Sequence, residues 1–556
     1  MNTDSELVKQ IIQINATIKD FVWGPYMLVL LVGTGIYLSV RLGFPQFKHF
    51  VFAIKNTIGK MFNKDEEVKG AMTPFQAVST ALASTVGTGN IAGVTGAIVL
   101  GGPGAVFWMW LSGIFGMCTK YCEVTLALKH REKNANGDWV GGPMYYIKNG
   151  LNPKMKFLGT LFALFGALCC FGIGNLTQIN SISTQFLNVV NAFGGTNFTP
   201  YDGTGYAIAL SIGIIVSFFA AFCLIGGISA IGRVTERMVP AMVAVYLACA
   251  IIVVLANIQR VPQVLYDIFY YAFNPGALKG GIAGITIMTC IRNGVARGVF
   301  SNEAGLGSAP MAHATSSETK PHKQGLYGIF EVFVSTICIC TLTALVVLTT
   351  GVAYDNFGNP AMADSKTTAM AFQTVFGDRL GSLILAVALF MFAASTILGW
   401  ALYGVRCAEY LFGPKVIRPY ELFFCAVIVL GSVTNLTIVW DIADTLNGLM
   451  AIPNLIAILL LSPWLAKSTI QYFTKYDNDY QKQAVALDLS AEKAIENVEK
   501  VISESQKTNQ TADTPTVVKA IDKADKAIFD AQKVAMIAEE SIEEAGKALK
   551  ADGDDD

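Results

Sequence analysis

The chain has 556 residues, of which 53% are hydrophobic and 15% are charged, whereas about 25% of the residues of an ordinary soluble protein are charged. This shortage of charge argues against a water-soluble enzyme. Residues 466–556 hold 12 Lys/Arg and 19 Asp/Glu, a net charge of −7, and the first 465 residues carry +6. We interpret the first part as a polytopic membrane protein and the rest as a soluble tail. The small cationic excess argues against a nucleic-acid partner.

Eleven apolar runs are long enough to cross a membrane, at about 20 residues per crossing. They lie near residues 21–41, 74–100, 103–128, 157–190, 206–227, 238–256, 280–311, 326–352, 375–412, 421–439 and 442–465. The alternating loops hold 19 Lys/Arg on one side and 6 on the other. Because cytoplasmic loops carry the excess, we predict an extracellular N-terminus (1–20), a transmembrane domain (21–465) and a cytoplasmic acidic helical tail (466–556).

Two of these runs contain residues that interrupt an apolar helix. Residues 84–93, in span two, include three glycines, and span seven contains Arg297 and Glu303. Glycine weakens a helix, and an ionisable group at membrane depth is costly unless it faces the bundle interior or water. We therefore predict that both spans unwind near the midplane.

The order of the spans indicates an internal repeat. After span one, spans two to six and seven to eleven form two groups of five with opposite predicted orientation, and each group opens with an interrupted span. Such inverted repeats form a substrate and ion site where their discontinuous helices meet. The predicted fold is an all-α polytopic membrane protein of about eleven transmembrane helices, with one N-terminal span, a 5+5 inverted repeat and a soluble helical tail.

The break in span two offers partial charges of both signs. The amides near Gly89 begin the second half-helix and carry the positive end of its dipole, which suits a carboxylate. The carbonyl oxygens of Ala83 and Val86 end the first half and are hard donors for a small cation. An amino-acid carboxylate and a sodium ion can therefore share this break.

Two other spans carry polar side chains that can complete such a site. Ser395 and Thr396 are adjacent hydroxyls in span nine, and Trp400 shares a helix face with Thr396. The alternative is that both hydroxyls bond back to their own helix and that Trp400 only packs. In span four, Gln178 lies in an apolar run, where interhelical hydrogen bonding and ligand contact are both open.

The ionisable residues within the spans are expected to have structural roles. Glu303 and Arg297 are expected to pair and hold the span-seven break, with gating or contact with a substrate amine as alternatives. Lys120 and Glu123 are expected to snorkel toward the cytoplasmic interface. The four histidines show no metal-ligand spacing, and we assign them no chemistry.

The motifs of soluble enzymes do not fit this chain. Gly87-x-Gly89-x-x-Ala92 matches the dinucleotide fingerprint as a string, but the strand and βαβ unit that this fingerprint requires are not predicted around it. The sequence contains no Walker A lysine motif, no H-E-x-x-H and no G-x-S-x-G. We expect neither enzymatic activity, with no catalytic residues, nor an organic cofactor.

Several segments resemble the alanine or glycine:cation symporter family, also called the sodium:alanine symporters. Residues 101–116, GGPGAVFWMWLSGIFG, resemble its signature, and residues 84–93, 141–146, 297–310 and 399–404 are similar to other blocks of the family. The resemblance covers about residues 15–465 but not the tail. It implies a prokaryotic inner-membrane carrier with a leucine-transporter-like core, which imports alanine or glycine together with sodium by alternating access.

The resemblance also implies roles for particular residues. The implied substrate contacts are Thr88, Gly89, Asn90, Gln178, Gly298, Phe300, Ser301, Asn302 and Trp400. The implied sodium ligands are Ala83, Val86, Phe392, Ser395 and Thr396. Sodium is then a co-transported ion. A proton is the alternative coupling ion, against which the hydroxyl ligands argue.

The tail departs from the family pattern and leaves a further function open. Residues 484–506 and 515–549 are predicted to form two amphipathic helices, and an alanine-rich stripe on the second favours self-association or a cytoplasmic protein partner. A solvated charged extension is the alternative. If the tail signals, the protein is an amino-acid sensor rather than a symporter. The other expected partners are a small neutral amino acid and membrane lipid.

Overall fold

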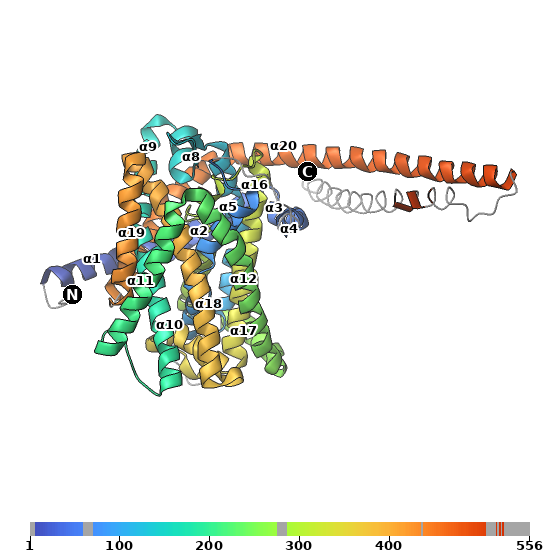
Figure 1. The fold of residues 1–556 in the computed structure, drawn as a ribbon. Helices are drawn as coiled ribbons and strands as arrows, with labels where there is room; N and C mark the ends of the chain where they lie inside the picture. Colours follow the sequence, from blue (N-terminus) through green and yellow to red (C-terminus); the bar gives the residue numbers. More distant parts are fainter. Residues whose placement is uncertain are drawn as a thin grey trace. The chain divides into compact units, whose positions relative to one another are not determined.

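The computed structural model describes residues 6–58, 70–274, 286–434 and 437–507, together with residues 519, 522, 523, 525 and 526. The chain divides into two compact units, Met1–Pro463 and Trp464–Asp556. The first unit holds a bundle of helices (Figure 1). In the described part of the chain, the all-α prediction misses one feature, a two-stranded antiparallel hairpin of β1 (Glu132–Lys133) and β2 (Trp139–Val140). The hairpin forms because Asn134 accepts hydrogen bonds from two backbone amides of the turn.

The chain enters the bundle through four helices. These are α1 (Glu6–Val22), α2 (Pro25–Arg41), α3 (Pro45–Lys48) and α4 (Phe50–Ile58). Predicted span one corresponds to α2, which begins with a proline at its first position, where the missing N–H costs nothing. The indole N–H of Trp23 donates to the backbone oxygen of Asp444 over 3.0 Å and ties this entry to a helix at the other end of the sequence.

Predicted span two is broken, as expected. Helix α5 (Pro74–Thr85) is followed by a single 3₁₀ turn, η1 (Thr88–Asn90), and by α6 (Ala92–Gly101), with a bend of 59° between the two halves. A capping box of Thr73 and Gln76 fixes the start of α5. The helix ends because Val86 leaves helical geometry, with φ −88° and ψ 84°. The break therefore falls within the glycine-containing stretch that predicted it.

Predicted span seven is also broken, at the end of the stretch that predicts it. Helix α14 (Ile287–Asn302) is intact past Arg297, and the chain unwinds only from Glu303 to the short helix α15 (Pro310–His313). Glu303, Gly305 and Gly307 all have positive φ, a region that ends a right-handed helix. Arg297 lies within the intact helix, and its long side chain extends away from the helix backbone to the lining of a cavity.

The remaining elements form the other predicted spans and the short segments that connect them. The first group is α7 (Ala105–Lys129), α8 (Pro143–Gly150), η2 (Pro153–Met155), α9 (Lys156–Phe171), the π-helical turn η3 (Gly172–Leu176), α10 (Thr177–Gly194), α11 (Gly203–Ile225), α12 (Gly227–Ala256), η4 (Ile258–Arg260) and α13 (Val261–Phe273). The second group is α16 (Pro321–Val332), the π-helical η6 (Phe333–Cys340), α17 (Thr341–Thr349), η7 (Tyr354–Asn356), η8 (Pro360–Met362), α18 (Ser365–Phe412), η9 (Pro414–Val416), α19 (Ile417–Ser432) and α20 (Thr437–Lys507).

Helix α18 holds a central position in the bundle. It packs against α5, α9, α10 and α12, and Figure 1 shows it among the helices of the first unit. Gly377, with φ 76°, separates a short N-terminal part from the long apolar part. From Phe392 to Ala408 nearly every side chain is buried, so residues on all faces of this segment contact protein and not lipid.

Seven helical segments of the described chain are long and apolar enough to cross a membrane, and the bent pair of α5 and α6 makes eight. The predicted spans that correspond to α7, α14 and α19 are not long or apolar enough to be counted among these eight. Helices α14 and α19 have 16 residues each, and α7 contains Lys120 and Glu123. The protein is thus a polytopic helical membrane protein.

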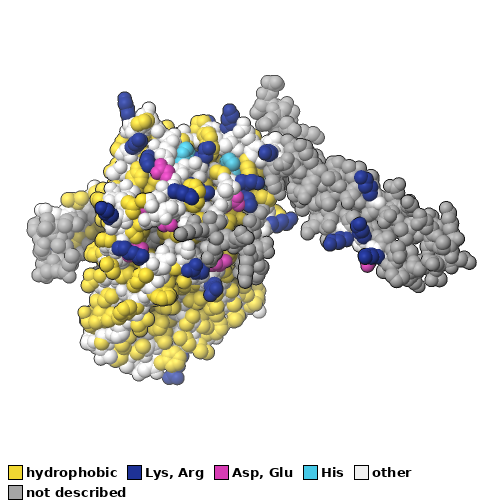
Figure 2. Space-filling model, turned by 45° about the horizontal axis from the view of Figure 1, so that its top comes forward, with side chains coloured by type: hydrophobic (Ala, Val, Ile, Leu, Met, Phe, Trp, Pro, Cys, Tyr) yellow, Lys and Arg dark blue, Asp and Glu magenta, His cyan; other side chains and the backbone are white. Residues whose placement is uncertain are grey.

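The surface of the first unit has an apolar zone and a charged zone. Large side chains on α11 are strongly exposed, among them Phe218 at 73% and Phe222 at 80%. Figure 2 shows hydrophobic side chains covering one part of the body, whereas Lys and Arg gather on another part. Exposed apolar surface of this extent fits contact with lipid tails.

Helix α20 continues past the predicted domain boundary at residues 465/466. It extends to Lys507 and so includes the whole first predicted tail helix, residues 484–506. The second predicted tail helix, residues 515–549, lies almost entirely outside the described residues.

Candidate substrate and ion site

The side chain of Asn90 stabilises the break between α5 and α6. The Oδ1 atom of Asn90 accepts the N–H of Gly87 over 3.1 Å. The Nδ2 group of Asn90 donates to Ser301 Oγ over 2.8 Å and to the backbone oxygen of Ser335 over 3.1 Å. Asn90 therefore satisfies backbone groups that have lost their helical partners and joins both broken spans.

A small cavity lies directly against this break. Its volume is about 10 Å³, near the smallest that holds one water molecule. It is lined by Ser84, Thr85, Gly87, Gly89, Ile173, Gln178, Phe300, Glu303, Leu306, Thr396, Trp400 and Asn447. These residues come from both broken spans, from α10 and its π-helical turn, from α18 and from α20. A cavity of this size does not hold an amino acid, so a substrate binds here only when some of these elements move.

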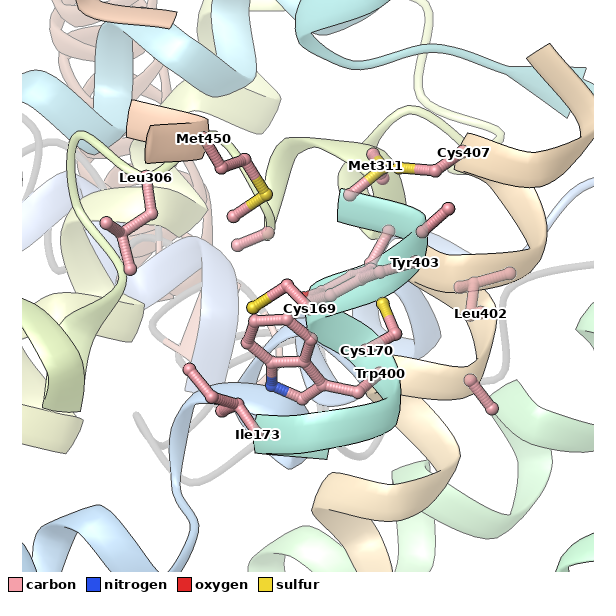
Figure 3. Packing of buried hydrophobic residues seen from close by; sticks show 14 of the residues in the cluster. Cys169, Cys170, Ile173, Leu306, Met311, Trp400, Leu402, Tyr403, Cys407 and Met450 are labelled. Carbon is pink, nitrogen blue, oxygen red and sulfur yellow. Dashed lines mark hydrogen bonds between the residues drawn. The ribbon is translucent and has the colours of Figure 1, made fainter. Parts of the chain in front are cut away.

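Four of the nine predicted substrate contacts border this cavity: Gly89, Gln178, Phe300 and Trp400. The aromatic side chains form its apolar wall, and Figure 3 shows the Trp400 ring with Ile173 close beside it. Gln178 is fixed by two bonds, from Nε2 to the oxygen of Ile173 over 2.9 Å and from Thr88 Oγ1 to its Oε1 over 3.2 Å.

The other five predicted contacts do not border the cavity, and most of them stabilise the breaks. Thr88 and Asn90 bond to side chains of other helices, and Ser301 also contacts Cys340 over 3.0 Å. Asn302 accepts the N–H of Ala304 over 2.9 Å and caps the end of α14. Gly298 packs on α7, since a Cβ there would lie 2.2 Å from Ser112 Oγ.

Two glycines allow the close packing around the cavity. A Cβ on Gly89 would lie 2.7 Å from the Phe300 ring, and one on Gly87 would lie 2.6 Å from Thr396 Oγ1. Real Cβ atoms do not approach so closely, so these positions require glycine. Any larger residue would push the aromatic wall or α18 away from the break.

The structure brings four of the five predicted sodium ligands together. Ser395 Oγ lies 3.2 Å from the Ala83 oxygen and 2.8 Å from the Phe392 oxygen. Thr396 Oγ1 lies 3.0 Å and 2.8 Å from the same two oxygens. Because Phe392 belongs to α18, both hydroxyls do bond back to their own helix, as the alternative expects, but both also reach α5. Val86 is buried at the end of α5, and no described hydrogen bond joins it to this group. The four residues present two carbonyls and two hydroxyls, an oxygen donor set suited to a small hard cation.

Several lining residues were not among the predicted contacts. Ser84, Thr85, Ile173, Leu306 and Asn447 border the cavity. Asn447 is 1% exposed, and its Oδ1 has no hydrogen-bond partner in the described structure. A buried amide oxygen without a partner is costly, so a ligand group is a natural partner for it. The sequence signal was an Asn inside an apolar span, one of the two in residues 442–465, which packing alone would not require.

The predicted ion pair of Glu303 and Arg297 is not formed. Glu303 borders the cavity and accepts a hydrogen bond from Ser308 over 2.6 Å. The Arg297 guanidinium lies 5.8 Å from the centre of the Phe300 ring and lines a second cavity of about 380 Å³, which Arg292 also lines. The two side chains diverge because the helix ends at Asn302 and the backbone turns away at Glu303.

The prediction that Lys120 and Glu123 snorkel is wrong. Both side chains are fully buried. Lys120 Nζ lies 3.3 Å from Glu331 Oε1, and Glu331 also contacts His313, a histidine to which the sequence assigned no chemistry. Helices α14 and α16 pack along α7 and close the path to the interface.

Comparison with known proteins fits this geometry. Residues 8–486 match the Sodium:alanine symporter family. The chain belongs to this family, which consists of transporters and not of enzymes. Its match includes both breaks, the cavity and the hydroxyl pair of α18.

Similar proteins agree with this assignment. The sodium/alanine symporter AgcS of Methanococcus maripaludis is 44% identical over 458 residues, which cover 82% of this chain and 95% of that protein. The probable sodium/glutamine symporter GlnT of Bacillus subtilis is 36% identical over 448 residues, which cover 80% of this chain and 87% of that protein. Among solved structures, MhsT in complex with L-phenylalanine matches 71% of this chain and 90% of that chain, with a TM-score of 0.52 and 13% identity, a likeness of fold alone.

Proposed function

We propose that this protein is a sodium-coupled symporter that imports alanine, glycine or both by alternating access. One observation carries the proposal: two hydroxyls of α18 meet the carbonyl oxygen of Ala83, where α5 ends, beside a closed cavity. Sodium bound among these oxygens would fix the distance between α18 and the break. The name of the Methanococcus relative, a sodium/alanine symporter, supports the same ion and substrate.

The proposed substrate lies along the break with its carboxylate toward the amides of Gly87 and Gly89. These amides begin the second half of the span, where the helix dipole favours negative charge. The Phe300 and Trp400 rings then limit the size of the substrate side chain. The remaining predicted contacts would act indirectly, because they stabilise the conformation of the two breaks. They are Thr88, Asn90, Gly298, Ser301 and Asn302.

The binding of sodium and the binding of the amino acid would be coupled because both involve the end of α5. Sodium held by Ala83, Val86, Phe392, Ser395 and Thr396 would order the end of α5, and the same segment would bind the amino acid. Each ligand then raises the affinity for the other by the same factor, since binding coupling is reciprocal. Hydroxyl and carbonyl oxygens favour sodium over a proton as the coupling ion.

The proposed architecture has eleven spans, with one N-terminal helix before a 5+5 inverted repeat. The breaks after α5 and after α14 open the two halves of that repeat, a pattern that supports alternating access around a fixed site. The excess of Lys/Arg in alternate loops supports an N-terminus (1–20) outside, a transmembrane domain (21–465) and a cytoplasmic tail (466–556). The proposed location is the inner membrane of a prokaryote, and the tail is the proposed site of self-association or of a protein partner.

The proposal is tested by uptake of labelled L-alanine into proteoliposomes that contain the full chain. An inward sodium gradient is compared with an equal potassium gradient, and glycine and D-alanine serve as competitors. We expect concentrative uptake only with sodium. Uptake that follows a pH gradient without sodium would overturn the coupling ion, and no uptake of any small amino acid would overturn the transport function.

A further inference from the structure

Four ionisable side chains are buried together at the meeting point of α7, α14 and α16. Glu123, Glu303 and Glu331 are at most 2% exposed, and Lys120 is fully buried. Lys120 and Glu331 lie within electrostatic range of both Glu123 and Glu303. We call these four residues the carboxyl cluster. Only Glu303 among them borders the cavity at the break.

Glu331 is held in its ionised form by three neighbours. Lys120 Nζ lies 3.3 Å from Oε1, and the Thr85 hydroxyl donates to the same oxygen over 2.6 Å. His313 Nε2 lies 3.0 Å from Oε2. A carboxylate with a cation and two further donors is stabilised as an anion.

The contacts of His313 fit a neutral ring. Ser316 Oγ lies 3.0 Å from Gln324 Oε1, and the amide nitrogen of Gln324 lies 3.0 Å from His313 Nδ1. With the amide in this orientation, Nδ1 accepts, and the proton lies on Nε2 and is donated to Glu331. The carboxyl cluster thus contains three carboxyl groups and one cation.

Glu123 and Glu303 differ in their access to the cavity. Glu123 Oε1 accepts from the N–H of Gly305 over 3.0 Å and from Asn454 Nδ2 over 2.6 Å. Its Oε2 has no hydrogen-bond partner in the described structure, and the side chain does not border the cavity. Glu303 lies 2.6 Å from the hydroxyl of Ser308. Because a hydroxyl can donate or accept, the Ser308 contact suits both the ionised and the protonated carboxyl. The indole N–H of Trp400, which also reaches Glu303, only donates, and it can bond to a carboxylate or to the carbonyl oxygen of the acid.

The other groups that face Glu303 do not supply a further positive charge. They are Lys120 and Glu123 from α7, Glu331 from α16, the thiols Cys169 and Cys170 from α9 and the phenol Tyr403 from α18. On its own helix, Arg297 turns toward Phe300. Among the described residues, Lys120 is therefore the one cation that faces Glu303.

The charges of the carboxyl cluster do not cancel when all four side chains are ionised. Three carboxylates and one ammonium carry a net charge of −2, and one bound sodium ion would still leave −1. Excess charge buried in a bundle is costly, and a carboxyl in this position takes up a proton instead. A zwitterionic amino acid adds no net charge, but its ammonium can take the place of that proton beside a carboxylate.

Glu303 also has an unusual backbone. Its φ of 54° lies in the left-handed region, which only one other non-glycine residue of the described chain adopts. Glycine is the usual residue at such a helix end. A strained residue retained where glycine would fit is a pointer to function.

We propose that Glu303 carries a proton in the closed protein without substrate and releases it when an amino acid binds with its ammonium group beside the carboxylate. This inference rests on the proposed function, because it requires that an amino acid occupies the cavity. In the step, the O–H bond of the carboxylic acid breaks, the electron pair stays on the oxygen, and the proton passes to water in the open site. The ammonium then donates hydrogen bonds to the carboxylate. The carrier thus exports a proton for each amino acid that it imports.

The test is calorimetry of L-alanine binding to the purified full chain at saturating sodium. The same titration is made at one pH in two buffers of different ionisation enthalpy, because the difference in heat counts the protons released. We expect about one proton per alanine in mildly acidic buffer, and an apparent Kd that rises about tenfold for each further unit of decreasing pH. Alanine binding without proton release would overturn the proposal and leave the symporter intact, whereas no binding at all would overturn both.

Matched variants assign the proton to one side chain. Glu123→Gln removes a carboxyl that does not border the cavity and should keep the release of a proton. Glu303→Gln should bind alanine weakly and release none. Glu303→Asp keeps a carboxyl and should restore both binding and release. Loss of release in Glu123→Gln, or its persistence in Glu303→Gln, would overturn the assignment to Glu303.

Discussion

The hydroxyl of Thr396 lies 3.0 Å from the carbonyl oxygen of Ala83, although 313 residues separate them in the chain. The neighbouring hydroxyl of Ser395 lies 3.2 Å from the same oxygen. Helix α18 therefore contacts α5 at the point where the backbone of α5 stops hydrogen-bonding to itself. A cation at this point would be bound by oxygens of both helices, and the hydroxyls would keep their protons but turn their lone pairs toward the ion. The contact is therefore a natural coupling element.

The double substitution Ser395→Ala and Thr396→Ala tests this element. We expect the sodium concentration for half-maximal alanine uptake to rise about tenfold or more, the effect of losing about 1.4 kcal/mol of ion binding. Uptake is measured against external sodium in proteoliposomes. Thr374→Ala is the control, since this hydroxyl of α18 only bonds back to Ala371. An unchanged sodium dependence in the double variant would refute the ion site.

Gly89→Ala is expected to abolish alanine uptake at sodium concentrations that saturate the native protein. The added Cβ would lie 2.7 Å from the Phe300 ring, and the ring would move into the space that the substrate needs. Gly33→Ala, in α2, is the matched control because nothing lies within 4 Å of its Cβ. Uptake is compared at equal amounts of folded protein, judged by gel filtration. Normal uptake by Gly89→Ala would show that the substrate lies elsewhere.

Asn447→Ala should weaken alanine binding without lowering stability. The Oδ1 atom of Asn447 has no partner among the described residues, so its removal breaks no internal acceptor bond. Asn454→Ala, on the same helix, removes a 2.6 Å bond to Glu123 and should lower the free energy of unfolding by about 1–3 kcal/mol. Binding isotherms and thermal unfolding distinguish the two variants. An unchanged alanine affinity in Asn447→Ala would exclude Asn447 from the substrate site.

The pair of Lys120 and Glu331 is predicted to be essential for stability. Lys120→Met leaves a buried carboxylate without its cation, which costs about 3–5 kcal/mol. The combined change Lys120→Met and Glu331→Gln should recover part of this loss. Thermal unfolding in detergent measures both. The control is Lys148→Met, which removes a half-exposed pair with Glu132 and should cost about 1 kcal/mol or less. Equal losses in the two single variants would contradict the buried pair.

Deletion of residues 484–556 separates transport from signalling. The proposed site lies entirely between Ala83 and Asn447, so we expect sodium-dependent alanine uptake to persist at near-native rates. Uptake in proteoliposomes is the measurement, with the full chain prepared in parallel. Loss of uptake with intact alanine binding would favour a role of the tail in the transport cycle.

Local composition was sufficient to predict the break in span two. Gly87 and Gly89 lower helix stability within a short stretch, and the helix ends there. The break in span seven also falls within the stretch that predicts it, residues 292–307, but at its end, from Glu303 onward, and not at Arg292 or Arg297. A long basic side chain can leave an intact helix and reach a cavity, whereas the positive φ angles after Asn302 end the helix.

The roles of the site residues were harder to predict. Asn90, Ser301 and Asn302 have the polar groups of ligand contacts. In the structure, Asn90 and Asn302 satisfy backbone groups at the breaks, and Ser301 bonds to the side chain of Asn90. A polar side chain at a break looks the same in a sequence whether it faces a ligand or a neighbouring helix. Asn447 and Glu303 border the cavity because of packing between segments that lie far apart in the chain.

The sequence by itself determined the membrane class, the family and the two interrupted spans, since hydropathy, glycine content and motif blocks are local properties. Only the tertiary structure decided which polar groups meet. The convergence of Ser395 and Thr396 on Ala83 and the burial of Lys120 with three carboxyl groups depend on how α7, α14, α16 and α18 pack. The physical reason is that the energy of a charge or a hydroxyl inside a membrane protein depends on its neighbours, and those neighbours are distant in the chain.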